Sequence, residues 1–228
     1  MVYQVNPAAE INGEIRVPGD KSISHRSLIL SSIAEGESRI EGLLEAEDCL
    51  STMEIMRDLG IEITKEAEGE YTVQGKGLDG LEEADDVLDC GNSGTSMRLL
   101  AGLLASQDFY SVLTGDHSLR KRPMQRIIGP LSKMGAKIWS RRDGLAPLSI
   151  KGQKLESMEY KLPVASAQLK SSILLASLKT EAEAVIIEPA VSRDHTERML
   201  QGAGVDLEIK EDRIILKKAA ARKLKPFQ

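Results

Sequence analysis

A threefold internal repeat constrains the fold of this chain more than any other feature of its sequence. Three segments begin with small polar residues and continue into aliphatic stretches of helical character: 21–30, 92–101 and 165–174. When the segments are aligned, Arg26, Arg98 and Lys170 fall in register, 72 residues apart each time. A short unit that cannot bury its apolar face alone must pack against its copies. The chain is therefore predicted to fold as three related units.

Each unit is predicted to continue with a short strand, a second helix and a hairpin. The strands are expected at 38–43, 111–114 and 184–188, and the second helices at 48–59, 123–134 and 195–203. A glycine follows each second helix, where it supplies the left-handed C-terminal residue, and Pro123 would open the middle one. Alternating apolar residues on either side of a polar turn then indicate a hairpin in every unit.

The predicted fold class is α/β: a pseudo-threefold domain of three β-α-β-α-β-β units, with buried helices and sheets outside. The first helix of each unit is apolar on most sides, and a helix of that kind is buried. Sheets must then cover the three helices from outside, because each apolar face needs a partner layer.

The composition excludes several classes of protein. Acidic residues outnumber basic ones by 35 to 30 and aromatic residues make up only 3% of the chain, which argues against nucleic-acid binding. No apolar run approaches the ~20 residues of a membrane span, and the N-terminus lacks the layout of a signal peptide. Cys49 and Cys90 have no metal-ligand spacing and indicate reduced thiols in a cytoplasmic protein.

Motifs for metal or nucleotide binding are also missing from the sequence. His25, His117 and His195 show no metal-ligand spacing, so no metal site is predicted, and neither a dinucleotide nor a phosphate-loop signature occurs. His25 is open to two interpretations, a ligand contact or an ordinary histidine near a helix start. Cys90 is expected to be a small buried side chain rather than a nucleophile.

The starts of the three first helices suggest a site for anions. Each starts with Ser, Thr, Asn or Gly, and the first turn of a helix has unpaired N–H groups and a partial positive charge. If the three starts converge, Lys21, Arg26, Arg98 and Lys170 would surround one anion-binding face. Basic residues at 120–122 and 193 would extend it. The alternative is that these polar residues only cap the helices and that the cations point to solvent.

Five motifs in this chain together resemble those of the 5-enolpyruvylshikimate-3-phosphate synthase (EPSP synthase) family. They are Pro18–Arg26, Gly91–Arg98, Arg122–Pro123, Ala165–Gln168 and Ser192–Thr196. The resemblance implies the enolpyruvyl transferase-like fold and a transferase of the shikimate pathway. Such an enzyme has two pseudo-threefold domains with the active site between them. It moves the enolpyruvyl group of phosphoenolpyruvate to shikimate 3-phosphate, releases phosphate and needs no cofactor.

The resemblance also assigns roles to matching residues of this chain. Shikimate 3-phosphate would be bound by Lys21, Ser22, Arg26, Ser166, Ala167, Gln168 and Arg193. Phosphoenolpyruvate would be bound by Lys21, Asn92, Gly94, Thr95, Arg122 and Gln168. Lys21 would thus touch both substrates as a catalytic contact, and the inhibitor glyphosate would occupy the phosphoenolpyruvate position. Leu99 stands where many members carry proline, which leaves glyphosate sensitivity undecided.

The family's organisation divides the chain into three parts. Residues 1–18 would form a strand and crossover that pair with the second domain, 19–218 the N-terminal domain, and 219–228 the crossover to the C-terminal half. The groups for proton transfer lie in that half, so the chain is expected to bind substrate without turnover. The alternatives are a stand-alone anion-binding or interaction domain, a homodimer in which two copies mimic the two-domain cleft, or half of a relative of UDP-N-acetylglucosamine enolpyruvyl transferase.

Overall fold

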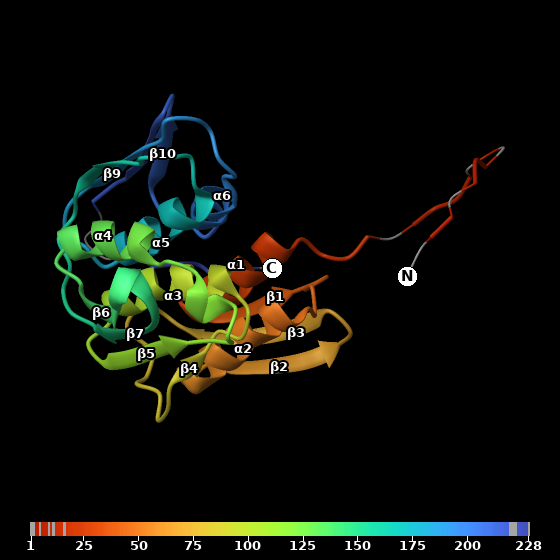
Figure 1. Cartoon of the computed structure of the whole chain (residues 1–228), viewed down its shortest axis with the longest axis horizontal. Helices are drawn as coiled ribbons and strands as arrows, with labels where there is room; N and C mark the ends of the chain where they lie inside the picture. Colours follow the sequence, from red (N-terminus) through yellow and green to blue (C-terminus); the bar gives the residue numbers. More distant parts are fainter. Residues whose placement is uncertain are drawn as a thin grey trace.

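The predicted repeat is present as three sheets arranged around three central helices (Figure 1). The computed structural model describes every residue except 1, 2, 5, 9, 11, 16, 219–222 and 228. The first unit contains α1 (Lys21–Ser32), β1 (Glu35–Ile40), α2 (Glu47–Asp58), β2 (Glu62–Ala67) and β3 (Glu70–Lys76). Its strands form one sheet in the order β1-β3-β2, with β3 antiparallel to both neighbours.

The second and third units each add a four-stranded sheet and two α-helices. The second contains β4 (Leu88–Asp89), α3 (Gly94–Ala105), β5 (Tyr110–Thr114), the 3-10 turn η1 (Leu119–Lys121), α4 (Gln125–Lys133), β6 (Lys137–Arg141), η2 (Arg142–Gly144) and β7 (Leu145–Lys151). The third contains β8 (Glu159–Lys161), α5 (Ala167–Ser177), β9 (Ala184–Ile187), α6 (His195–Gly202), β10 (Leu207–Lys210) and β11 (Arg213–Leu216). Their strand orders, β4-β5-β7-β6 and β8-β9-β11-β10, are equivalent.

The predicted β-α-β-α-β-β unit is confirmed for the second and third units, whereas the first lacks its opening strand among the described residues. In the other units that strand runs parallel to its neighbour, as β4 does to β5 and β8 to β9. Beside β1 the equivalent place is taken by residues 223–227: Leu224 forms a parallel bridge with Ala34, and Phe227 accepts a hydrogen bond from the Arg39 amide. The C-terminal residues therefore complete the threefold pattern.

The boundaries predicted at the two ends of the chain lie partly outside the described residues, at 1, 2, 5, 9, 11, 16, 219–222 and 228. The described residues of segment 1–18 form no strand, and Tyr3, Ile15 and Val17 are exposed. Figure 1 shows this segment leading away from the body of the molecule. The predicted pairing of 1–18 and crossover role of 219–228 stay predictions.

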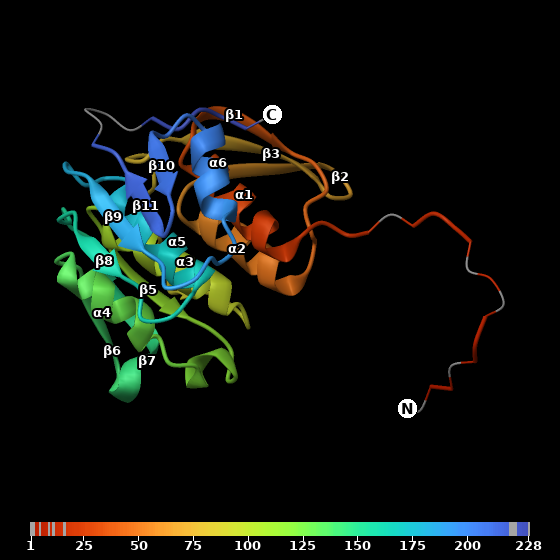
Figure 2. The same ribbon diagram turned by 90° about the horizontal axis from the view of Figure 1, so that it is seen from above.

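The three central helices are buried as predicted, and the sheets lie around them (Figure 2). Their apolar side chains form the centre of one continuous hydrophobic core, with Leu28, Leu100 and Leu174 among its fully buried members. Helices α3 and α5 pack closely, because a Cβ atom at Gly102 would overlap the carbonyl oxygen of Ser172. The small residues in these helices therefore set how near the helix axes approach one another.

One predicted helix start is wrong by two residues. The second helix of the middle unit begins at Gln125, so Pro123 precedes the helix instead of opening it. The Met124 amide donates to the carbonyl of Gly144 at 2.8 Å, and this long-range hydrogen bond delays the helix. The helices predicted at 48–59 and 195–203 are confirmed, within one residue, as α2 and α6.

We expect Gly102→Ala to lower the free energy of unfolding by about 1–3 kcal/mol, because the added methyl group forces α3 away from α5. Urea unfolding at constant pH measures this change. The matched control is Gly202→Ala, also in a helix, where the new Cβ meets no atom within 4 Å; there we expect unchanged stability or a gain of up to about 1 kcal/mol. Equal effects of the two substitutions would contradict the close helix packing.

Candidate anion-binding site

The N-terminal ends of α1, α3 and α5 meet at one side of the molecule. Gln168 in the first turn of α5 donates to Thr95 Oγ1 in the first turn of α3 at 2.9 Å, and Arg98 Nη1 donates back to Gln168 Oε1 at 2.9 Å. Helix α1 joins them through Arg26, whose Nη2 donates to Ser171 Oγ of α5 at 2.7 Å. The convergence predicted from the repeat is therefore confirmed.

Side-chain caps fix the three helix starts. Asp20 accepts from the Ile23 amide, Ser93 from the Ser96 amide and Ser166 from the Leu169 amide. The capping interpretation is thus correct for these residues, and it does not remove the positive end of each helix. A cap satisfies only part of the first-turn N–H groups, so three helix ends still direct partial positive charge at one place.

Two arginines gather at the start of α3 around Gly94. A Cβ atom at Gly94 would lie 2.7 Å from Arg98 Nη1 and 3.4 Å from Arg122 Nη1, so glycine is needed for the guanidinium groups to come this close. Arg122 donates to Asn92 Oδ1 at 2.6 Å. Burial, and then the neighbouring cations Arg122 and Arg126, lower the pKa of Arg98. Like charges held together in this way favour binding of an anion.

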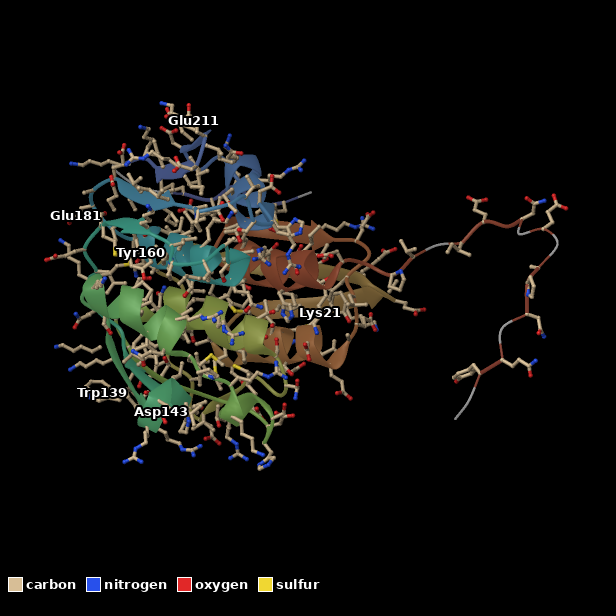
Figure 3. The ribbon with its side chains drawn as sticks, turned by 45° about the horizontal axis from the view of Figure 1, so that its top comes forward. Lys21, Trp139, Asp143, Tyr160, Glu181 and Glu211 are labelled. Atoms are coloured by element: carbon tan, nitrogen blue, oxygen red, sulfur yellow. The ribbon has the colours of Figure 1, made fainter. Side chains whose placement is uncertain are left out.

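A second group of cations lies at the start of α1. Arg193 Nη1 donates to Ser22 Oγ at 2.8 Å, and Lys21, half-exposed, forms an ion pair with Asp48. Figure 3 shows Lys21 on the side of the molecule opposite Tyr160 and Glu181. Among the described residues Arg98, Arg122 and Arg193 have no carboxylate partner within ion-pair distance, which leaves positive charge available on an acidic chain.

Arg26 lies beneath the surface that the other predicted site residues share. Its side chain is 3% exposed and donates to the Ser22 carbonyl, Ser171 Oγ and Thr196 Oγ1 at 2.8, 2.7 and 2.6 Å. Burial lowers its pKa to about 10, against the opposing effect of Glu197. Arg26 therefore ties α1, α5 and α6 together below the helix starts.

The prediction that Lys170 joins the anion-binding face is wrong. Lys170 is 1% exposed, and its Nζ pairs with Glu188 Oε2 at 2.7 Å and Glu197 Oε1 at 2.5 Å. The repeat aligns the three cations, but they stand six, five and four residues after the caps Asp20, Ser93 and Ser166. Because each residue turns a helix by about 100°, equal spacing in sequence gives different directions in space.

The structure brings together ten of the eleven predicted site residues at the three helix starts, with Arg26 directly below. Lys21, Ser22 and Arg193 lie at the start of α1, Ser166, Ala167 and Gln168 at that of α5, and Asn92, Gly94, Thr95 and Arg122 at that of α3. Sequence reasoning missed Asp48, Glu188 and Glu197 as partners of the lysines. The strand predicted at 184–188 ends in a carboxylate, and that was the available signal for Glu188.

His25 is a fully buried structural residue rather than a ligand contact. Its Nδ1 is 2.7 Å from Thr52 Oγ1, which is 2.6 Å from Ser96 Oγ, so a chain of polar contacts joins α1, α2 and α3. Burial lowers the pKa of His25 to about 4. The ring is therefore neutral at physiological pH and is not a proton donor there.

Both cysteines lie in the interior, as predicted for Cys90. Cys49 and Cys90 are buried; burial raises the pKa of Cys49 to about 11 and that of Cys90 further, so neither thiol is a nucleophile. Within the described ranges no group of three or more His, Cys, Asp or Glu side chains is placed to hold a metal ion. In the same part of the chain, no helix has the length and apolar character needed to cross a bilayer.

Comparison with known proteins gives one consistent result. The model of the EPSP synthase (3-phosphoshikimate 1-carboxyvinyltransferase) family matches residues 5–226. A 3-phosphoshikimate 1-carboxyvinyltransferase of Magnetococcus marinus is 60% identical over 198 residues, which are 86% of this chain and 44% of the relative. The protein of the same name from Petrotoga mobilis is 52% identical over 219 residues, 95% of this chain and 51% of the relative.

Solved structures agree with the sequence relatives. An EPSP synthase from Acinetobacter baumannii superimposes with a TM-score of 0.91 at 49% identity, over 94% of this chain and 48% of that one. A second structure of the enzyme from the same organism gives a TM-score of 0.90 at 48% identity, over 94% and 49%. The chain thus spans about half the length of the relatives that it matches.

We expect the free energy of unfolding to fall as the pH decreases from 6.5 towards 4, because of His25. The unfolded state binds a proton near the ordinary pKa of 6.5, and the folded state binds one only near 4. Protons therefore favour unfolding in this window, by up to about 3 kcal/mol in total. Urea unfolding at a series of pH values measures the slope, and His25→Gln should remove this part of it. The same slope in both proteins would show that His25 does not cause the effect.

Proposed function

Since the chain belongs to the EPSP synthase (3-phosphoshikimate 1-carboxyvinyltransferase) family, we propose that it supplies the part of that enzyme's active site that holds two anionic substrates. These are shikimate 3-phosphate and phosphoenolpyruvate, and the reaction transfers the enolpyruvyl group between them with release of phosphate. The observation that carries the proposal is the meeting of three helix N-terminal ends, flanked by Arg98, Arg122 and Arg193 without carboxylate partners in the described chain.

The chemistry of both substrates suits such a site. Each carries a phosphate and a carboxylate, and both groups accept hydrogen bonds from helix N–H groups and guanidinium forks. Arginine provides paired donors in a fixed plane that match these oxygens. An acidic chain in which several arginines at one place have no carboxylate partner among the described residues is therefore suited to bind small polyanions there.

We assign shikimate 3-phosphate to the region between the starts of α1 and α5. Arg193 and Ser22 already contact each other there, and Lys21 lies at the first position of α1. The start of α5 would contribute the backbone of Ala167 and the side chains of Ser166 and Gln168 to the same region. Arg26 supports it from below, and its guanidinium adds positive charge beneath Ser22.

We assign phosphoenolpyruvate to the start of α3. The guanidinium groups of Arg122 and Arg98 lie near Gly94, and Asn92 holds Arg122 in place. Thr95 and Gln168 are hydrogen-bonded to each other, so the two substrate positions are adjacent and share Gln168. Lys21 completes the shared contact, and glyphosate would compete at the phosphoenolpyruvate position.

We assign catalytic turnover to the full-length enzyme, as represented by the relatives. The reaction delivers a proton to the enolpyruvyl methylene group and removes one from the attacking hydroxyl, and general acid–base groups contribute roughly 10²–10⁴ in rate. The relatives are about twice as long as the part matched here. We therefore propose that the C-terminal half of the enzyme is the partner, that these 228 residues bind without turnover, and that the protein acts in the cytoplasm, where buried thiols stay reduced.

We expect Lys21→Met to weaken binding of shikimate 3-phosphate at least about tenfold, because an opposite charge next to a dianion is lost, while the melting temperature stays nearly unchanged. A partly exposed ion pair such as Lys21–Asp48 adds only about 0–1 kcal/mol to stability. Titration calorimetry and thermal unfolding give the two values. Lys65→Met is the matched control, because Lys65 is equally exposed and pairs with Glu45 at 2.8 Å on β2. A large loss of stability in Lys21→Met would show a structural role instead.

We expect the purified chain alone to release no phosphate from the two substrates. When the separately expressed C-terminal half of a relative is added, we expect phosphate release. Excluding water and aligning the reactants requires the closed cleft. A colorimetric phosphate assay measures both conditions. Release by the chain alone would contradict the absence of turnover, and binding of anions without any effect of the second half would favour a stand-alone binding domain.

A further inference from the structure

A buried group of four charged side chains lies directly behind the proposed shikimate 3-phosphate position. Lys170 and Arg26 contribute two positive charges, and Glu188 and Glu197 contribute two negative ones, so the group is electrically balanced. The four side chains are 1%, 3%, 8% and 1% exposed, respectively. No substrate can reach Lys170 at this exposure, so its pairing with two buried carboxylates calls for another explanation than ligand contact.

The ammonium group of Lys170 holds both ends of one loop. Its Nζ pairs with Glu188, directly after β9, at 2.7 Å and with Glu197, in the first turn of α6, at 2.5 Å. The loop 189–194 runs between these two anchor points. Within the loop, Ser192 Oγ donates to the second carboxylate oxygen of Glu188 at 2.5 Å. The loop is therefore attached to α5 at its two ends, and a third contact inside it joins Ser192 to the first of these ends, Glu188.

The same loop carries Arg193 to the start of α1. Arg193 follows Ser192 directly, is exposed, and reaches Ser22 Oγ at 2.8 Å. Beyond the loop, Thr196 accepts from Arg26 and is 2.7 Å from Ser171 Oγ. These contacts tie the stretch around Arg193 to helices α1 and α5.

Stability alone is a weak reason for such an arrangement. A buried ion pair roughly balances its own desolvation, and apolar side chains of similar size would stabilise the fold as well. Preorganising a side chain before the ligand arrives does, however, reduce the ordering cost of binding. An exposed arginine on an unsupported loop would lose conformational entropy each time a ligand binds, and this loss would weaken binding.

We infer that Lys170 is a positioning residue, which fixes the loop 189–194 through Glu188 and Glu197 so that Arg193 is held ready for the phosphate group of the substrate. Ser192 is hydrogen-bonded to Glu188 and therefore restricts the backbone next to Arg193. The inference rests on the proposed function, because it takes Arg193 as a contact to shikimate 3-phosphate. It adds three residues, Lys170, Glu188 and Ser192, that act on binding without touching the ligand.

The main test removes the contact inside the loop and leaves the four buried charges in place. We expect Ser192→Ala to weaken binding of shikimate 3-phosphate by about three- to tenfold in calorimetry. In an Arg193→Ala background the same substitution should change binding by less than about twofold, because residues that act through one another are not additive. Ser157→Ala is the matched control: Ser157 is also half-buried in a loop and donates at 2.7 Å to Ala182 O, and it should leave binding unchanged.

A second measurement follows the loop itself by amide hydrogen exchange. We expect Ser192→Ala to speed exchange within 189–194 while the helices α1 and α5 keep their protection. The double variant Lys170→Met with Glu188→Gln keeps the charges of Arg26 and Glu197 balanced, and it should speed exchange in the same loop and weaken binding further. If this double variant does not fold, hydrogen exchange and binding of Ser192→Ala alone still test whether the loop positions Arg193.

The outcomes separate the inference from the proposed function. Unchanged exchange in 189–194, or an equal loss of affinity from Ser192→Ala with and without Arg193, would overturn the positioning role. If the unsubstituted chain does not bind shikimate 3-phosphate at all, the proposed function fails, and the exchange measurement still shows whether Lys170 and Ser192 fix the loop. Faster exchange confined to the loop together with the non-additive loss of binding would support both.

Discussion

The close packing of α1, α3 and α5 with their N-terminal ends at one side is the constraint on which the rest of this structure depends. Aligned peptide dipoles place partial positive charge at each helix start, and bringing three of them together would be unfavourable without a negative partner. The contacts Gln168–Thr95 and Arg26–Ser171 hold the ends in place. The proposed site for small anions is therefore a consequence of the way in which the core is built.

The distribution of charge reinforces this constraint. The chain carries a net charge of −5, and many of its exposed lysines pair with carboxylates, as Lys65 does with Glu45 and Lys154 with Glu181. Arg98, Arg122 and Arg193 have no such partner among the described residues. In the proposed function, an acidic surface around this basic region would direct anionic ligands to the helix starts.

The C-terminal residues close the threefold pattern of this domain. Residues 223–227 lie beside β1, where β4 and β8 lie in the other two units. The first unit is thus completed by chain that follows the third one. The Ala34–Leu224 bridge therefore connects the first unit to residues that follow the third unit.

The threefold repeat and the order of helices and strands could be predicted from the sequence, because apolar periodicity and glycine caps act over a few neighbouring residues. Short motifs likewise identified Thr95, Arg122 and Gln168 as candidate site residues. The inward turn of Lys170 to Glu188 and Glu197, while Arg98 stays at the helix start, required the three-dimensional structure, since the direction of a side chain depends on where its helix begins. The three-dimensional structure also decided that His25 is neutral, because its pKa depends on burial by segments distant in sequence.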